Sequence, residues 1–252
     1  MRCTKILGVD LHAVTFREAV DTISGFFAPE NGDSGGARVI VTPNSEMLMI
    51  ARKNPEFKAL LDDADLVIPD GIGVKLASRL NKVKIRQRLS GIEVFEALMQ
   101  EQGGNISVYF LGGRPGVGGQ PCVAELAGVR LSQKYGIKVA GAHDGFFDDE
   151  AERAIIADIR AKKPDLLLVG LGMVRQEQWI ARNRDLPVGA MAGIGGSLDV
   201  YSGTLKGAPK WMRNCGLEWL ARLLRQPTRA WRMRVLPWFV VVVVARKIFR
   251  RG

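Results

Sequence analysis

An aspartate at the end of an apolar run is the first residue of this sequence with an evident chemical use. Asp70 follows the segment ADLVIP and precedes Gly71 and Gly73. A carboxylate at the end of a buried strand is costly unless it is paired or used. Two roles fit these residues: a catalytic carboxylate, or the N-cap of the helix that begins near Gly71.

Several predicted strands end in glycine or a small polar residue just before a helix. The segments are VTPNSE, VIPDGIG, FLGGRPG, VGLG and AGIGGSLD. In open parallel sheets, ligands bind outside the carboxyl ends of the strands, where helix N-termini offer N–H groups to phosphate. The loops therefore suit one side of a nucleotide site, although glycine after a strand is also ordinary turn chemistry.

Short apolar runs alternate with segments of helical periodicity, which predicts a Rossmann-like α/β fold with a mostly parallel sheet and helices on both faces. Strands are expected over 5–12, 38–43, 65–70, 106–113, 137–147, 165–172 and 188–196. Helices are expected over 15–27, 45–62, 73–102, 122–136, 148–163 and 174–185.

Charge divides the 252 residues into two parts. Residues 1–203 carry a net charge of −1 and form the predicted α/β core, whereas residues 204–252 carry +11. The basic segment is also rich in tryptophan and is predicted to be a helical appendage that binds an anionic partner. Three scattered cysteines without a CxxC pair, and the lack of a signal peptide, indicate a reducing, cytoplasmic location.

The appendage contains an apolar run of 11 residues, Val235–Ala245. A membrane-spanning helix needs about 20 such residues. Tryptophans interleaved with arginines instead predict a segment that lies on an anionic bilayer. The alternative is a core or edge strand with solvated arginines, and nucleic acid is not expected as a partner.

Other familiar chemistries fit poorly. The segment GGRPGVGG lacks the GxGxxG spacing of a dinucleotide site. The acids of DDAD (62–65) and DDE (148–150) are interpreted as solvated or helix-capping residues rather than metal ligands. With only two histidines in the chain, no metal site is expected.

Seven ordered motifs together resemble the WecG/TagA/CpsF glycosyltransferases from about residue 5 to 235. They are TPNSE (42–46), PDGIGV (69–74), RLSGIEVF (88–95), LGGRPGV (111–117), GLGMVRQEQWI (170–180), GIGGSLDVYSG (193–203) and the segment 208–232. The resemblance implies an inverting, metal-independent transfer from a UDP-sugar to a lipid-linked acceptor at the cytoplasmic face of the membrane. The best-known reaction moves N-acetylmannosamine from UDP-ManNAc to undecaprenyl diphosphate-linked GlcNAc in wall teichoic acid synthesis.

The resemblance also implies roles for individual residues. Asp70 corresponds to the candidate general base, and Arg88 to an arginine beside the active site. The residues implied in nucleotide or acceptor binding are Thr42, Asn44, Gly112, Gly113, Gln176, Gly196 and Asp199. Arg222, Arg229 and Arg232 match appendage arginines that would contact either the diphosphate or lipid headgroups, although Pro227 must break their helix.

Two departures from the family pattern concern the donor. Met173-Val174-Arg175 stands where many relatives have a small residue, Pro and Lys, and Leu198 stands where Phe is commoner. Another donor such as UDP-ManNAcA or UDP-glucose is therefore an alternative. A non-catalytic membrane-binding module and a soluble nicotinamide oxidoreductase are the alternatives from other classes, and self-association is a further possibility.

Overall fold

A computed structural model describes residues 1–27, 36–225 and 235–249 of this chain. Within these residues the main sheet has six parallel strands in the order β4-β3-β8-β7-β5-β6. The strands are β3 (Arg38–Val41), β4 (Leu66–Val67), β5 (Ser107–Gly112), β6 (Lys138–His143), β7 (Leu166–Gly170) and β8 (Ala190–Gly193). Because all of them run in one direction, their carboxyl ends meet at one edge. The predicted Rossmann-like α/β fold is confirmed.

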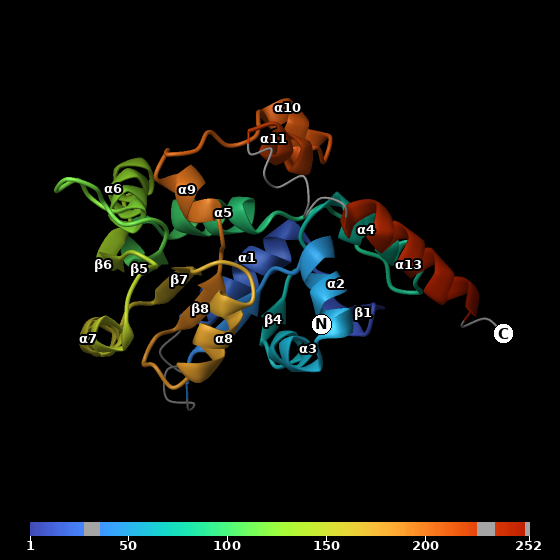
Figure 1. The fold of residues 1–252 in the computed structure, drawn as a ribbon, viewed down its shortest axis with the longest axis horizontal. Coiled ribbons are helices and arrows are strands. Elements are labelled where there is room, and N and C mark those ends of the chain that lie inside the picture. The colour runs from blue at the N-terminus through green and yellow to red at the C-terminus, as the bar shows by residue number, and fades with distance from the viewer. Residues whose placement is uncertain (28–35, 226–234, 250–252) are drawn as a thin grey trace.

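Helices cover both faces of the sheet (Figure 1). Alternate strand residues point to opposite faces, so Val39 and Val41 join one buried cluster while Ile40 joins the other. The first cluster receives side chains from α2 (Ser45–Lys53), α3 (Pro55–Asp62), α7 (Asp149–Lys162) and α8 (Arg175–Arg182). The second receives them from α1 (Phe16–Gly25), α5 (Gly91–Gln102), α6 (Val123–Tyr135) and α9 (Ser197–Tyr201). The short helix α4 (Ile72–Ser78) adds Val74 and Ala77 to the first cluster, whereas η2 (Gly103–Asn105) is a short turn without buried residues.

The segment predicted as a first strand, residues 5–12, belongs to a separate hairpin. Strand β1 (Cys3–Ile6) pairs antiparallel with β2 (Val9–His12), and neither strand joins the main sheet. Leu7 and Gly8 form the turn with φ values of 50° and 100°. A two-residue hairpin turn with positive φ at both positions matches the right-handed twist of its strands. The prediction of one strand was wrong because this turn interrupts the apolar run.

A histidine fastens this hairpin to the edge of the main sheet. His12, the last residue of β2, accepts a hydrogen bond at Nδ1 from the Val67 N–H of β4, 2.8 Å away. Burial, together with the N-terminal ammonium group, lowers the pKa of His12, while Asp10 opposes this shift. The neutral ring is therefore the form that fits, since only a neutral imidazole can accept this bond.

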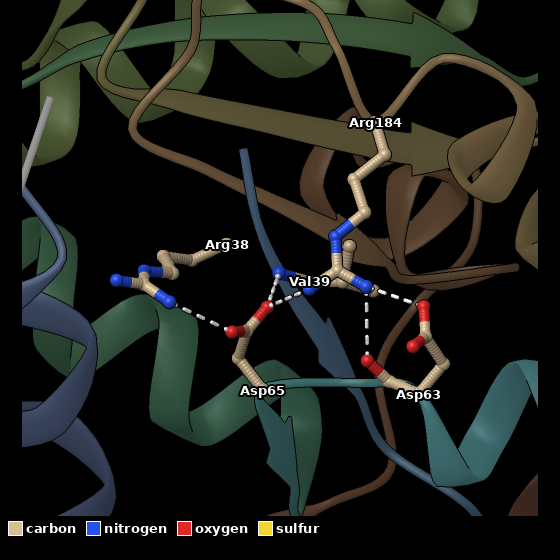
Figure 2. Close-up of polar contacts among 5 residues, drawn as sticks. All are labelled: Arg38, Val39, Asp63, Asp65 and Arg184. Carbon is tan, nitrogen blue, oxygen red and sulfur yellow. Dashed lines mark hydrogen bonds and ion pairs between the residues drawn. The ribbon is translucent and has the colours of Figure 1, made fainter. Parts of the chain in front are cut away.

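Aspartates bind neighbouring strands together at the amino edge of the sheet. Asp65 precedes β4, and its carboxylate accepts from the Val39 N–H at 2.8 Å, from Arg38 at 3.0 Å and from Arg184 at 2.8 Å (Figure 2). Its side chain is only 16% exposed. The interpretation of Asp65 as a solvated or capping residue was therefore wrong, because two arginines from separate segments reach it.

Asp63 and Asp148, two more of the acids interpreted as solvated or capping, have different outcomes. Asp63 pairs with Arg184 through its carboxylate, but its side chain is 75% exposed (Figure 2). Asp148 caps α7 as predicted, since its carboxylate accepts from the Ala151 N–H at 2.9 Å. An equivalent of Asp65 exists before β7, where Asp165 accepts from the backbone N–H of Ser107 at 2.7 Å. An aspartate before a strand thus holds the start of the adjacent strand.

The C-terminal part is helical in the residues that the structure describes. It comprises α10 (Lys210–Asn214), α11 (Glu218–Arg225) and α13 (Val235–Phe249), so the valine run is a helix and the strand alternative is wrong. Phe239 and Val242 are buried in the first core cluster, and α13 contacts α2 and α4. Over the described ranges, no helix combines the length and apolar character needed to cross a bilayer.

Candidate active site

The loops after β3 and β4 bring four of the predicted site residues together. The Asp70 N–H donates to the Pro43 carbonyl at 3.1 Å, which places Asp70 beside the segment that carries Thr42 and Asn44. Asp70 also forms a parallel bridge with Leu89, and the Gly71 N–H donates to the Leu89 carbonyl at 3.0 Å. Arg88 therefore lies in the strand-like segment next to Asp70.

The capping alternative for Asp70 is settled by the start of α4. The N-cap of that helix is Gly71, with a φ of 88° that glycine adopts without strain. Asp70 is the half-buried residue before the cap. The N-cap interpretation is wrong for this carboxylate.

Arg88 joins the core to the C-terminal helices. Its Nη1 donates to Glu218 of α11 at 2.8 Å, and its Nη2 donates to Glu93 of α5 at 2.9 Å. Arg213 of α10 lies 3.6 Å from the same Glu93 carboxylate. The side chains of Arg88 and Glu218 are 15% and 19% exposed, so both charges are largely removed from water. The guanidinium group of Arg88 thus connects helix α11 to the segment that pairs with Asp70.

Thr42 and Asn44 have clear local roles in this arrangement. Asn44 caps α2, because its side-chain oxygen accepts from the N–H groups of Glu46 at 2.9 Å and Met47 at 3.0 Å. Thr42 lies against the start of α5, where a Cβ on Gly91 would be 3.1 Å from its Oγ1. Asn44 therefore fixes the start of α2, and Thr42 packs against the start of α5.

Glycines allow the ends of β5 and β7 to approach closely. Gly112 has a φ of 135°, and a Cβ there would lie 2.4 Å from the Gly170 carbonyl oxygen. The Gly113 N–H donates to that same carbonyl at 3.2 Å. A larger residue at position 112 would force the loops after β5 and β7 apart. The predicted binding glycines thus have a structural requirement of their own.

Gln176 is buried and connects the loops after β7 and β8. Its Oε1 accepts from the Gly195 N–H at 3.0 Å, and its Nε2 donates to Glu177 Oε1 at 2.7 Å. Glu177 Oε2 accepts from the Val174 N–H at 2.7 Å. Burial raises the pKa of Glu177, while the hydrogen bonds from Gln176 and from the backbone act in the opposite direction. This chain of bonds ends at the loop that carries the exposed Gly196.

Helix α9 connects the loops after β7 and β8 with the start of α5, which follows Arg88. Asp199 is half-buried in the first turn of α9, and the Tyr201 hydroxyl of the same helix donates to the Ile92 carbonyl of α5 at 3.0 Å. A carboxylate and a guanidinium thus lie at the same sheet edge as several glycine-rich loops. Chemically, such an edge can remove a proton from a hydroxyl group and bind a phosphorylated leaving group.

The predicted appendage arginines are placed only in part. Arg222 belongs to α11, whereas Arg229 and Arg232 lie outside the described residues. Three acids that shape the site were not predicted: Glu93, Glu177 and Glu218. Two of them had a sequence signal, since Glu218 is the single acid in the basic segment and Glu177 directly follows Gln176. Among described residues, no group of three or more His, Cys, Asp or Glu is suited to hold a metal ion.

Known proteins resemble this chain over nearly its whole length. Residues 4–252 match the Glycosyl transferase WecG/TagA/CpsF family. A Bacillus spizizenii protein named N-acetylglucosaminyldiphosphoundecaprenol N-acetyl-beta-D-mannosaminyltransferase is 37% identical over 84% of this chain and 80% of its own length. Proteins of the same name from Staphylococcus aureus and Bacillus subtilis are 32% and 35% identical, over 96% and 82% of this chain and 92% and 78% of their own lengths. The chain therefore belongs to the WecG/TagA/CpsF family of glycosyltransferases.

Proposed function

We propose that this chain transfers N-acetylmannosamine from UDP-ManNAc to N-acetylglucosamine linked to undecaprenyl diphosphate, as in wall teichoic acid synthesis. One observation carries the proposal: Asp70 and Arg88 lie on adjacent loops at the carboxyl edge of the sheet, in a member of a glycosyltransferase family. The matched relatives support the acceptor, because their printed name describes this transfer.

In this proposal Asp70 is the general base. Its carboxylate accepts the proton of the acceptor hydroxyl as that oxygen attacks the anomeric carbon of the donor, and UDP leaves from the opposite face. A single displacement inverts the configuration at that carbon and requires no covalent intermediate. Arg88 and the appendage arginines Arg222, Arg229 and Arg232 would offset the charge of the leaving diphosphate without a metal ion.

Nucleotide binding is proposed for the loops after β3, β5, β7 and β8. Thr42, Asn44, Gly112, Gly113, Gln176, Gly196 and Asp199 lie on or beside these loops.

One feature of this chain bears on which UDP-sugar is the donor. Val174 has a φ of 74°, which proline cannot adopt, whereas the family resemblance implies proline at this position in many relatives. UDP-ManNAcA and UDP-glucose are therefore the alternative donors.

We also propose that the protein binds the cytoplasmic face of the membrane through α13. Phe239 and Val242 fasten one side of this helix to the core, whereas Trp238, Val240 and Ile248 are each more than half exposed. An exposed apolar stripe on a segment with a net charge of +11 suits an anionic bilayer surface. If the protein self-associated instead, this stripe would be the surface to examine.

The first test is the mass of the product. The protein is mixed with UDP-ManNAc and a short-prenyl diphosphate-GlcNAc acceptor in EDTA, and we expect a product heavier by one N-acetylhexosamine unit. Asp70→Asn should lower turnover by at least about 100-fold, because general-base catalysis contributes about that much or more. Its affinity for UDP should stay within about threefold, since the base acts on the acceptor.

Asp149→Asn is the matched control. It makes the same aspartate-to-asparagine change at an exposed position in the first turn of α7. It should keep wild-type turnover. Full turnover by Asp70→Asn would exclude Asp70 as the base. If no UDP-sugar is consumed by the wild type, and Asp70→Asn binds vesicles equally well, the non-catalytic membrane module becomes the better description.

A further inference from the structure

We propose that Glu177 is a positioning residue, whose buried carboxylate fixes the orientation of the Gln176 amide and through it holds the loop 193–196 in place. This inference rests on the proposed function, since that loop carries Gly196 and leads to Asp199. It assigns a task to a residue that makes no contact with substrate in the proposal above. Its basis is a set of three hydrogen bonds, of which the one between the Gln176 and Glu177 side chains is buried and the other two are partly buried.

The direction of each bond follows from the chemistry of the carboxylate. An ionised glutamate accepts hydrogen bonds but donates none. Glu177 is 4% exposed and meets two donors, the Val174 N–H at 2.7 Å and Gln176 Nε2 at 2.7 Å. Gln176 must therefore turn its nitrogen toward Glu177 and its oxygen toward the Gly195 N–H, 3.0 Å away. Without the carboxylate, the Gly195 N–H alone would select this orientation of the amide.

The loops at the two ends of this chain of bonds need such support. Val174 is β-branched and has a φ of 74°, a conformation that costs free energy and persists only when its surroundings hold it. Gly195 also has positive φ, at 50°. A Cβ on Gly193 would lie 2.6 Å from Gln176 Nε2 and 3.0 Å from Glu177 Oε1, so the backbone of β8 leaves room for this pair only as glycine.

Replacing the carboxylate by an amide should therefore move the loop without removing any atom from the core. In Glu177→Gln, the new side-chain amide has one oxygen and one nitrogen, and it faces two donors, the Val174 N–H and Gln176 Nε2. Its nitrogen therefore opposes one of these two donors. If the Gln176 amide reverses to relieve this contact, its nitrogen opposes the Gly195 N–H. A buried donor without an acceptor costs about 1–3 kcal/mol.

The exchanged variant Gln176→Glu/Glu177→Gln provides the rescue. The new amide at position 177 accepts from the Val174 N–H through its oxygen and donates through its nitrogen to the new carboxylate at position 176. The second oxygen of that carboxylate accepts from the Gly195 N–H. All three bonds return with their polarity satisfied, although the charge has moved by one residue. Glu150→Gln is the matched control, because Glu150 is exposed on α7.

The experiment is hydrogen exchange of the full chain without substrate, read by mass spectrometry on peptides that cover residues 190–200. We expect Glu177→Gln to accelerate exchange there by about tenfold or more, and the exchanged variant to restore the wild-type rate. If Glu177→Gln does not fold, Gly193→Ala disturbs the same contact and should accelerate the same peptide. Unchanged exchange in the single variants, or no restoration in the double variant, would overturn the proposal.

Kinetics with UDP-ManNAc then separate positioning from a general loss of structure. Glu177→Gln should raise the KM for the donor by about tenfold and change kcat by less than about threefold. Equal kinetics for wild type and Glu177→Gln would contradict the proposal. Lack of donor turnover by the wild type would refute the proposed function alone, because the exchange experiment does not depend on turnover.

Discussion

Asp65 and Asp63 offer a sharp test of how much one buried carboxylate stabilises this fold. Both acids contact Arg184, but their side chains are 16% and 75% exposed, respectively (Figure 2). Replacing each by alanine removes a carboxylate at nearly the same place in the sequence. The difference between the two variants therefore reports on the surroundings of the carboxylate and not on its charge alone.

The magnitudes follow from the contacts. Asp65→Ala removes three hydrogen bonds and leaves the Val39 N–H without its acceptor. Hydrogen bonds to charged groups contribute about 1.5–3 kcal/mol each, but Arg38 and Arg184 are about one-third exposed and regain water. We expect a loss of about 2–4 kcal/mol in the free energy of unfolding. Asp63→Ala should cost less than about 1 kcal/mol, as exposed ion pairs do.

Urea unfolding followed by circular dichroism measures this difference. With a slope of about 3 kcal/mol per M, Asp65→Ala should lower the midpoint by about 1 M and Asp63→Ala by less than about 0.3 M. Equal midpoints for the two variants would refute the reasoning. Folded Asp65→Ala should keep wild-type turnover, since Asp65 lies at the amino edge and the proposed site at the carboxyl edge.

Three further predictions concern the C-terminal helices and the hairpin. Glu218→Gln should weaken the attachment of α11, because Arg88 loses its ion pair with Glu218, and amide exchange in α11 should rise by about tenfold. Below pH 6.5, stability should fall as the depressed pKa of His12 is crossed, because the neutral ring accepts from Val67 and the protonated ring cannot. His12→Asn keeps an acceptor and should remove this loss in acid thermal melts. Val241→Asp, on the exposed side of α13, should weaken sedimentation with anionic vesicles by about tenfold or more and leave the melting temperature within about 2 °C.

Much of the fold is encoded in local patterns that the sequence displays. Apolar runs that end in glycine predict the strands of the main sheet and their carboxyl edge, because that alternation depends on neighbouring residues. The Leu7-Gly8 turn was missed because Leu7 is apolar, so in the sequence it looks like the middle of a strand, whereas in the structure it has a positive φ.

The side-chain partners in the site could not be predicted in this way. Arg88 and Glu218 are 130 residues apart, so nothing local connects them. Glu93 stands three residues after Ser90, the spacing of a capping box, yet it pairs with Arg88 and no side chain caps α5. Glu177 follows a predicted site residue, but the residue type does not show whether a glutamate is buried or exposed. Which charges meet is decided by the packing of separate elements.

Strand β4 makes this limit concrete, because an aspartate stands on each side of it. The segment runs from Asp65 through the two-residue strand Leu66–Val67 to Asp70. Both residues are aspartates, so the residue type does not distinguish them. The direction of the strands does, because it places Asp65 at the amino edge of the sheet and Asp70 at the carboxyl edge. At the amino edge, Asp65 accepts from two arginines and a backbone N–H, so its hydrogen-bonding capacity is used by the fold. At the carboxyl edge, Asp70 meets the loops where open parallel sheets bind ligands. The direction of β4 is therefore the physical reason to assign stability to the first aspartate and chemistry to the second.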